Sequence, residues 1–360
     1  MNTSDLRAEF PVFERLAYLN AGTDGPVPRA GIEAARERMR TELERGRSGE
    51  AHLGLIKRGA DSLRERLAEL MGASPDEVAL THSTTDGVAT VLSSLPLGRG
   101  DEVLTSDEEH PGLLAPLELA RRKRGFGVRV VPFPELAAGV RRDTKLVACS
   151  HVSWVSGEVV DAAALASRAP LLLLDGAQGL GAVPVDVDAL GCDFYAASGQ
   201  KWLCGPDGSG SLFVRRAIAD EPEPPWPNFG SLAQPDRPSE LVFHRGARRF
   251  DLGISPGPST AWALAAFDLL ASAGWGAVFE RGAAGAELLS ARLRERGLEV
   301  ASRGRSTLVS WRSDRAEEGA RALAAAGIVV RHVPGRGLIR ASVGAWTSEE
   351  DIARLANAVA

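Results

Sequence analysis

A lysine and an aspartate follow two strand-like segments in the middle of the chain. Leu171–Leu174 is an apolar run typical of a buried parallel strand, and Asp175 comes directly after it. A second apolar segment, Phe194–Ala197, ends shortly before Lys201. Lys201 is the only lysine after Lys145, in a chain that otherwise uses arginine for positive charge. Because an amine can lose its proton and act as a nucleophile, whereas a guanidinium cannot, we expect Lys201 to do chemistry.

This pair of side chains fits pyridoxal phosphate (PLP), a cofactor with an aldehyde and a pyridine ring. Lys201 would form a Schiff base with the aldehyde, and ionised Asp175 would keep the ring nitrogen protonated so that the ring accepts electrons. Each residue alone has an ordinary alternative. Asp175 could cap the turn after its strand, and Lys201 could be a surface lysine. The pairing of the two favours the catalytic interpretation.

A PLP site also needs phosphate donors, a contact for the ring hydroxyl, a face for the ring and a cation for the substrate carboxylate. A strand-to-helix transition offers backbone N–H groups and hydroxyls to a phosphate, and an arginine inside an apolar strand suits a carboxylate. The candidates are Ser83, Thr84 and Thr85 for the phosphate, Gln178 for the ring hydroxyl, His110 for the ring face and Arg340 for the carboxylate. Each candidate alone has an ordinary alternative. The Ser83–Thr85 stretch could cap a helix, and Gln178 could be an ordinary turn residue. His110 could lie on the surface, and Arg340 could belong to an internal ion pair. Their joint occurrence in this order favours the site.

The elements that must position these residues alternate between strands and helices. Strands are predicted at 78–80, 102–105, 127–131, 145–149, 171–174 and 194–197. This alternation predicts an α/β fold with a mostly parallel sheet, which binds ligands beyond the carboxyl ends of its strands. We expect an N-terminal arm (1–15), a large PLP-binding domain (16–256) that includes a proline-rich surface excursion (216–250), and a small α+β domain (257–360) that includes a single strand at Ile328–Val333.

Composition narrows the class of protein. The 360 residues carry a formal net charge of −5 without a basic stripe, so nucleic acid is not an expected partner. No apolar segment approaches the roughly 18 residues that span a bilayer, and the N-terminus does not resemble a secretory signal. Three scattered cysteines suit neither a disulfide framework nor a metal site. We therefore expect a cytoplasmic enzyme without a membrane partner or a metal.

The residues around Lys201 match a known pattern. The central block comprises Asp175-Gly176-Ala177-Gln178, Val183-Pro184-Val185-Asp186, Cys192-Asp193-Phe194-Tyr195, Ser198-Gly199-Gln200-Lys201-Trp202 and Gly205-Pro206-Asp207-Gly208. Further matching stretches are Thr81–Gly87, Glu109-His110-Pro111, Ser150–Ser153 and Ile339–Ser342. Together they resemble the class V aminotransferase family, the cysteine desulfurase-like enzymes that use PLP.

The resemblance implies the type I fold of PLP-dependent transferases, with a mostly parallel seven-stranded sheet in the large domain. It also implies a homodimer with the active site at the subunit interface and a small amino acid as substrate. The implied roles are Schiff-base formation for Lys201, the ring-nitrogen partner for Asp175, ring stacking for His110, the ring-oxygen contact for Gln178, phosphate binding for Thr84, Thr85 and Ser198, and the substrate carboxylate clamp for Arg340. We assign Gln200 to the cofactor-binding residues and Asn20 and Trp154 to the substrate-binding residues.

The sequence departs from the desulfurase pattern in several places. Gln200 replaces a histidine before the lysine, and Trp154 replaces an asparagine near the ring. Where desulfurases offer Gly-Thr-Pro to the partner subunit's phosphate, this chain has Gly253-Ile254-Ser255-Pro256, so Ser255 or a backbone N–H must substitute. The stretch before Arg340 contains no cysteine to accept sulfur. A persulfide-forming desulfurase is therefore not expected.

The stretches His151–Gly157 and Lys201–Pro206 resemble the cysteine/cystine C–S lyase and isopenicillin-epimerase-like branch. The resulting expectation is C–S bond cleavage by β-elimination from a cysteine-derived amino acid. An aminotransferase or an epimerase needs the same groups and stays open, as does a PLP-fold binding protein without catalysis. A Rossmann dehydrogenase is disfavoured, because the first strand is not followed by a Gly-x-Gly-x-x-Gly turn. The sequence leaves open the substrate side chain and whether residues 216–250 gate the site.

Overall fold

A computed structural model describes residues 3–253 and 256–359. At its centre lies a seven-stranded sheet in which only β8 runs against its neighbours, as the strand–helix alternation predicts. Its strands, in spatial order, are β2 (Val78–Thr81), β8 (Gly210–Val214), β7 (Phe194–Ser198), β6 (Leu172–Asp175), β5 (Thr144–Ser150), β3 (Glu102–Ser106) and β4 (Gly127–Val131). The expected α/β fold with a mostly parallel sheet is thus confirmed.

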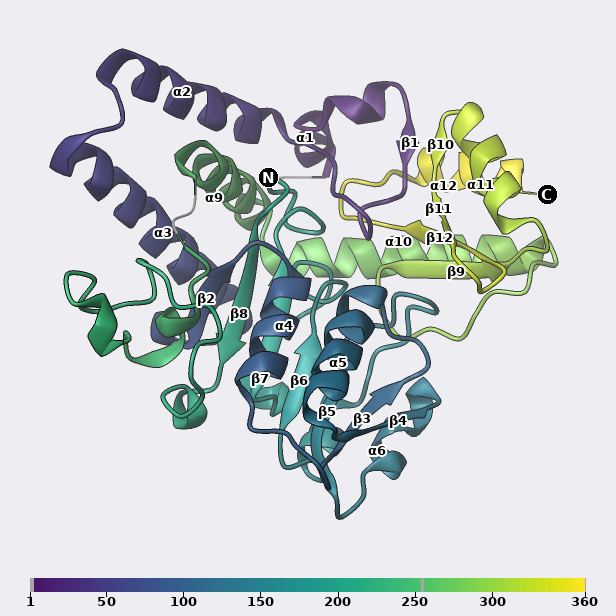
Figure 1. Ribbon diagram of the computed structural model, residues 1–360. Helices are drawn as coiled ribbons and strands as arrows, with labels where there is room; N and C mark the ends of the chain where they lie inside the picture. Colours follow the sequence, from purple (N-terminus) through teal and green to yellow (C-terminus); the bar gives the residue numbers. More distant parts are fainter. Residues whose placement is uncertain (1–2, 254–255, 360) are drawn as a thin grey trace.

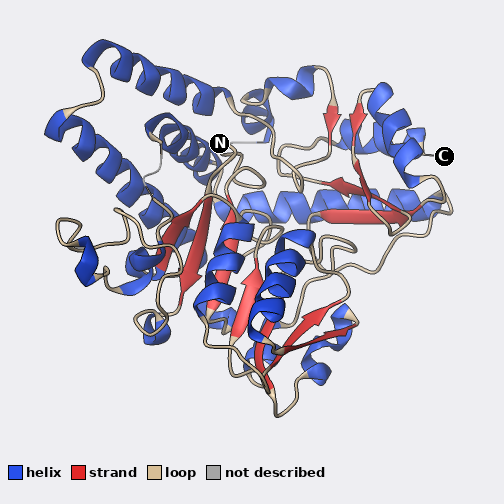
Figure 2. Cartoon of the chain, in the orientation of Figure 1, coloured by secondary structure: helices blue, strands red, loops and turns tan. Residues whose placement is uncertain are grey.

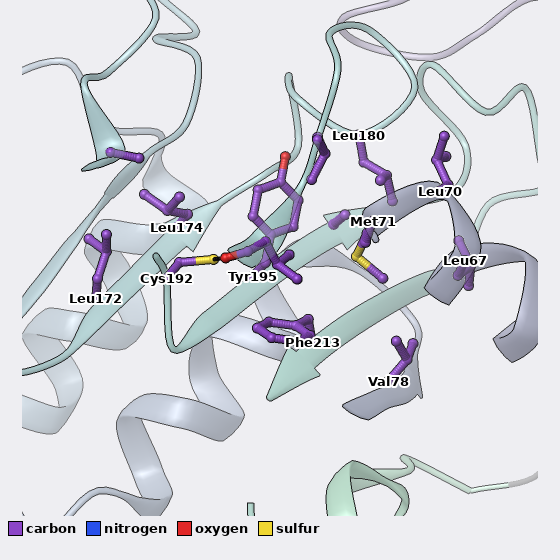
Figure 3. Close-up of a cluster of buried hydrophobic side chains, with 14 of the residues drawn as sticks. Leu67, Leu70, Met71, Val78, Leu172, Leu174, Leu180, Cys192, Tyr195 and Phe213 are labelled. Atoms are coloured by element: carbon purple, nitrogen blue, oxygen red, sulfur yellow. Dashed lines mark hydrogen bonds between the residues drawn. The ribbon is translucent and has the colours of Figure 1, made fainter. Parts of the chain in front are cut away.

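The central strands are apolar on both faces because helices cover both faces. In β6, Leu172 and Leu174 enter one core cluster and Leu173 enters the other. Helices α4 (Thr84–Ser94) and α5 (Pro111–Arg124) cover the face of Leu173. Figure 3 shows the opposite face, where Leu172 and Leu174 gather with Tyr195 of β7 and Met71 of helix α3 (Gly49–Met71). A strand buried on both sides therefore reads as a continuous apolar run.

The remaining helices frame this sheet. A helical hairpin of α2 (Arg29–Arg45) and α3 projects from the body in Figure 1, and α9 (Gly257–Ser272) packs against both of its helices. Helix α10 (Trp275–Glu295) then leads to the C-terminal unit, which comprises the strands and helices of residues 308–358. Short helices α6 (Leu136–Gly139), α7 (Ala162–Ala166) and α8 (Val187–Leu190) connect the strands, and Figure 2 shows how helices enclose the sheet. The expected arm contains α1 (Thr3–Ala8).

The C-terminal unit contains a three-stranded antiparallel sheet in the order β11 (Arg331–Val333), β12 (Leu338–Ser342), β9 (Leu308–Arg312). Helices α10, α11 (Ala316–Ala325) and α12 (Glu349–Ala358) accompany it. The single strand expected at Ile328–Val333 is wrong. Its first half, β10 (Ile328–Val329), pairs with β1 (Ala17–Tyr18) in a separate sheet, while β11 pairs with β12. Because the two halves pair with different strands, the expected strand is interrupted at Val330.

Residues 216–250 lie beside the outer strand β2, away from the C-terminal unit. All of them are described, and they form three short 3-10 turns without an α-helix or a sheet strand. The last turn, η6 (Gly246–Phe250), packs on β2. Among the described residues, no single helix is both long and apolar enough to cross a membrane. Within the described ranges, α9 and α10 are the one helix pair that meets that criterion together, and they are bent by 80° at their junction.

A buried ion pair fixes the segment that leads to residue 254. Both guanidinium Nη atoms of Arg64 in α3 bind the carboxylate of Asp251, at 2.8 and 3.1 Å. The same carboxylate accepts the Leu80 N–H of β2, and the Asp251 carbonyl accepts the side chain of Asn228. One carboxylate thereby joins α3, β2 and the end of the 216–250 excursion.

We predict that Asp251→Ala lowers the free energy of unfolding by about 3–5 kcal/mol, because it leaves Arg64 buried and unpaired. The matched control is Asp268→Ala. It breaks the Arg66–Asp268 pair, whose side chains are 32% and 55% exposed, and should cost less than about 1 kcal/mol. Denaturant unfolding of both variants measures the difference, and equal losses would contradict this account of the buried pair.

Candidate active site

A cavity of about 230 Å³ lies at the carboxyl ends of the parallel strands, between the large sheet and the sheet of the C-terminal unit. From the predicted set, its wall contains Ser83, Thr84, Thr85, His110, Trp154, Asp175, Gln178, Ser198, Gln200, Lys201 and Arg340. Asn20 is not part of this wall. Its side-chain oxygen accepts a hydrogen bond from the hydroxyl of Thr23, which does line the cavity. Ser255 lies outside the described residues. The wall also includes no residue of the 216–250 excursion.

A larger groove of about 460 Å³ lies beside Tyr18 and Ile32, along the N-terminal segment and α2. Its walls are mainly apolar, and its charged side chains are Arg29, Glu33 and Arg36. It contains no lysine and no buried carboxylate. The smaller cavity is therefore the one with groups suited to catalysis.

Asp175 ends β6 with its side chain buried at the cavity. Its backbone carbonyl accepts the His151 N–H, and its Oδ1 accepts the Ala177 N–H at 2.9 Å. Burial raises the pKa of the carboxyl group above its ordinary value, and the nearby Lys201 ammonium opposes that rise. The result is a carboxylate held in place by the turn that follows its strand.

Lys201 follows β7, and the accessible part of its side chain lines the cavity. Its carbonyl accepts the Cys204 N–H, which closes a tight turn in which Cys204 takes a left-handed φ of 54°. Burial lowers the pKa of the Lys201 amine to about 8, with Asp175 opposing and Arg340 adding to the shift. An appreciable fraction of the amine is then neutral near pH 7, which is the form that acts as a nucleophile or base.

Another part of the cavity wall is built around the N-terminus of α4. Ser83 caps the helix, because its hydroxyl accepts the Asp86 N–H at 3.1 Å. The helix-capping role that the sequence allowed for this stretch is therefore present as well. The hydroxyls of Thr84 and Ser198 lie 2.6 Å apart, and Ser198 also accepts the Thr84 N–H. This contact ties α4 to the end of β7. Hydroxyls at the positive end of an eleven-residue helix suit a phosphate.

His110 faces the cavity as a neutral ring. Its Nδ1 accepts the Gly112 N–H at the start of α5, so the ring hydrogen is on Nε2. Burial lowers the pKa of His110 to about 4, and the positive charges of Lys201, Arg331 and Arg340 contribute. The ring meets Trp154 edge to face, with 4.9 Å between centroids. The two aromatic rings form one wall of the site.

Arg340 is almost completely buried, and among the described residues no acidic side chain pairs with it. Its Nη1 donates to the Trp154 carbonyl at 2.8 Å, while Nε and Nη2 have no hydrogen-bond partner in the described part of the chain. Burial lowers its pKa to about 9, with Arg331 contributing. A buried guanidinium with two free donors fits an incoming carboxylate and does not fit the internal ion pair that the sequence also allowed.

Arg331 is a cavity residue that the sequence reasoning missed. It lies on β11 directly opposite Arg340 on β12. Its Nη1 donates to Thr23 Oγ1 at 3.2 Å, and its guanidinium carbon lies 5.8 Å from the centre of the Trp154 ring. The signal was a second arginine in an apolar segment, but only the register of the hairpin shows that both arginines share one face.

Two hydrogen bonds within the protein orient the side chain of Gln178. Its amide donates to the Gly22 carbonyl at 2.7 Å, and its oxygen accepts the Trp202 indole N–H at 3.1 Å. One amide hydrogen is left for a ligand, since an amide nitrogen carries two. A Cβ at Gly22 would lie 2.8 Å from the Gln178 oxygen, so glycine is needed where this turn passes the cavity.

The unpartnered groups indicate the kind of ligand that the cavity accepts. Besides Arg340, the oxygen of Gln200 and the indole nitrogen of Trp154 are buried without partners among the described residues. Such groups are normally satisfied, by protein, water or ligand. A ligand with a phosphate at α4, an aromatic ring beside His110 and a carboxylate at Arg340 would supply acceptors for the free donors of this wall. The residues therefore fit PLP carrying an amino acid.

The family model for class-V aminotransferases matches residues 17–355. The chain belongs to the class-V aminotransferase family. Among curated relatives, a protein of Aeropyrum pernix named probable cysteine desulfurase is 34% identical over 272 residues, which is 70% of this chain and 66% of that protein. A cysteine desulfurase of Serratia proteamaculans is 32% identical over 64% of this chain and 62% of its own length. The chain thus spans slightly less than two thirds of these relatives.

Solved structures match over nearly the whole chain. A C-DES variant with glycine covalently linked to its PLP cofactor has a TM-score of 0.92 and 27% identity, covering 98% of both chains. The complex of the cystine C–S lyase C-DES with its reaction product cysteine persulfide has a TM-score of 0.91 and 27% identity, covering 97% of this chain and 98% of that one. These matches confirm the type I fold of PLP-dependent enzymes.

The turn that carries Asp175 tolerates no side chain at position 176. A Cβ there would lie 2.1 Å from the ring of Tyr195, the residue at the centre of Figure 3. We predict that Gly176→Ala displaces Asp175 and weakens PLP binding at least about 10-fold, or about 1.4 kcal/mol. Titration of the purified protein with PLP measures this. Gly98→Ala, which meets nothing within 4 Å, is the control, and unchanged PLP affinity in Gly176→Ala would contradict the prediction.

Proposed function

We propose that this protein is a PLP-dependent enzyme that cleaves a C–S bond of a cysteine-derived amino acid by β-elimination. The observation that carries the proposal is one cavity holding Lys201, Asp175 and the unpaired donors of Arg340. PLP binds amines through its aldehyde, and its protonated ring stores the electrons released at the substrate α-carbon. Support comes from two C-DES structures that share the fold, one with PLP and one described as a cystine C–S lyase.

The residues present would hold this cofactor in a defined orientation. Asp175 would accept the ring N–H, and ionised Asp175 would keep that nitrogen protonated. His110 would cover one face of the ring. The free amide hydrogen of Gln178 would bind the ring oxygen. The phosphate contacts would come from Ser83, Thr84, Thr85, Ser198 and Gln200.

The chain's own side chains then carry out the steps. Arg340 binds the substrate α-carboxylate through Nε and Nη2, which directs the Cα–H bond toward Lys201. The neutral amine of Lys201 takes the α proton, because burial has lowered its pKa to about 8. The Cβ–S bond breaks and the sulfur leaves with the electron pair. Lys201, now an ammonium, returns a proton to the leaving sulfur.

In this proposal the sulfur is released as part of the product and is not transferred to a cysteine of the enzyme. Sulfur relay through an enzyme persulfide needs an accessible thiolate. All three cysteines, Cys149, Cys192 and Cys204, are buried, and burial raises the pKa of each thiol. None of them lines the cavity. Although curated relatives are named cysteine desulfurases, this chain offers no cysteine suited to their sulfur transfer.

The second arginine of the cavity suggests the class of substrate. Arg331 and Arg340 face the same space, and neither is paired with an acidic side chain among the described residues. Two guanidinium groups suit a substrate with two carboxylates. Cystine has one at each end of its disulfide. We therefore propose cystine, with Arg340 on the α-carboxylate of the reacting half and Arg331 on the distal carboxylate.

We further propose a homodimer whose partner subunit supplies the segment around Ser255 to the phosphate. Support comes from the family resemblance of that segment and from the surface of the projecting hairpin. There, Met39, Leu43 and Leu53 are 59%, 85% and 59% exposed, and a partner subunit would cover these large apolar side chains. The cytoplasmic location stays a prediction.

We predict that Lys201→Ala abolishes the absorbance of the covalently bound cofactor and lowers kcat at least about 100-fold, since the general base is lost. The assay supplies L-cystine and measures pyruvate and reduced sulfur. The control is Lys145→Ala, at an exposed lysine of β5. Turnover by Lys201→Ala would exclude the proposed role. Amino-group exchange with L-alanine and pyruvate, without sulfur release, would instead support an aminotransferase.

We predict that Arg331→Gln raises KM for cystine at least about 10-fold while changing KM for S-methylcysteine less than about 3-fold. The reason is that only cystine has a distal carboxylate for a charge-assisted contact. Arg312→Gln, at an exposed arginine of β9, is the matched control. Equal changes of KM for both substrates would contradict the assignment of Arg331 to the distal carboxylate.

A further inference from the structure

A second carboxyl group, that of Glu109, is buried just behind the cavity wall and next to His110. Its side chain is 3% exposed. Oε1 lies 2.5 Å from the hydroxyl of Ser106, and Oε2 accepts both the N–H and the hydroxyl of Ser150, at 2.8 and 2.6 Å. Ser106 is the last residue of β3 and Ser150 the last residue of β5. Glu109 therefore ties together two strand ends at the edge where the site lies.

The next strand end along the same edge carries Asp175. Ser150 and Asp175 are paired residues in the β5–β6 ladder, so the serine that binds Glu109 is the ladder neighbour of Asp175. The charge of Asp175 acts on Glu109, and both carboxyl groups act on the buried thiol of Cys149. Lys201 is the cation that acts on Asp175. No lysine, arginine or histidine forms an ion pair with Glu109 in the part of the chain that the structure describes.

Two buried carboxylates served by one cation are unfavourable when both are ionised, which favours a proton on one of the pair. Asp175 has the nearby ammonium and an open side toward the cavity. Glu109 has neither. Its three hydrogen bonds favour the ionised form, but burial and the charge of Asp175 outweigh them and raise the pKa of Glu109 to about 8.

We propose that Glu109 is a positioning residue that stays protonated at neutral pH, which leaves Asp175 as the single carboxylate at the ring-nitrogen end of the site. In this arrangement Oε1–H donates to Ser106 and Oε2 accepts the two hydrogen bonds from Ser150. The neutral carboxyl group holds the ends of β3 and β5 in register with Asp175 on β6. Because Glu109 stands directly before His110, the same contacts fix the start of α5 and the ring face.

The proposal predicts that glutamine replaces Glu109 without loss. A glutamine amide has the shape of a protonated carboxyl group, with its NH₂ able to donate to Ser106 and its oxygen able to accept from Ser150. Alanine removes the link between the strands and leaves the serine groups without their partner. An ionised Glu109 would give a different result, since glutamine would then remove a buried charge.

The direct test is infrared spectroscopy of the wild-type protein and of Glu109→Gln, each with and without added PLP. We expect the wild-type minus variant spectrum at pH 7 to contain the carbonyl stretch of one protonated carboxylic acid. This band should disappear as the pH rises through about 8, the pKa expected for Glu109. If no acid band is lost with Glu109→Gln at pH 7, Glu109 is ionised and the proposal is wrong.

A second test uses PLP affinity and the spectrum of the bound cofactor. We expect Glu109→Gln to keep the Kd for PLP within about 3-fold of the wild type and to keep the pH dependence of the cofactor absorbance. Glu109→Ala should weaken PLP binding at least about 10-fold and shift that pH dependence, because Asp175 is no longer held. Glu118→Gln, on the exposed face of α5, is the control.

Equal losses in Glu109→Gln and Glu109→Ala would overturn the proposal, because they would show that the negative charge is needed. If Glu109→Ala does not fold, the comparison of wild type with Glu109→Gln still decides the matter through the infrared band and the Kd. Neither experiment measures turnover. The outcome for Glu109 is therefore independent of whether the protein proves to be a C–S lyase.

Discussion

The site depends on placing a lysine and a carboxylate together in a largely buried position at the ends of neighbouring parallel strands. Burial alone would drive each group toward its neutral form, and the mutual attraction of Lys201 and Asp175 opposes this for both. Parallel pairing of β6 and β7 brings the two strand ends to the same edge. The rest of the large sheet, apolar on both faces, holds that edge in place.

The cavity is assembled from two sheets with different tasks. The large sheet supplies Lys201, Asp175 and the phosphate end at α4, whereas the C-terminal sheet supplies Arg331 and Arg340. The N-terminal segment connects them. Its β1 pairs with β10 in the C-terminal unit, and Gly22 then passes between Gln178 and Arg340. Under the proposed function, residues positioned by the large sheet carry out the bond cleavage. Residues of the C-terminal sheet select the substrate by binding its carboxylates.

Membership of the class-V aminotransferase family determines the fold but not the reaction, since one fold supports many chemistries. The features that bear on the reaction are local. The Trp154 ring meets His110 edge to face, the Trp154 carbonyl accepts a hydrogen bond from Arg340, and Arg331 adds a second cation. The buried cysteines exclude an exposed sulfur acceptor. These features are the basis for proposing a lyase whose substrate carries two acidic groups.

The sequence by itself determined the α/β class, the Asp175–Lys201 pair and the unusual Arg340. Apolar runs and a lone lysine can be recognised from neighbouring residues in the chain, without knowledge of the fold. The roles of Arg331, Gly22 and Glu109 were decided only by the tertiary structure. Arg331 depends on the register of β11 and β12, and Glu109 on the adjacency of β3, β5 and β6. Likewise, the segment Ile328–Val333 breaks because its halves pair with strands far apart in the chain. Pairing between distant segments leaves no periodic trace in either one, which is why these features required the fold.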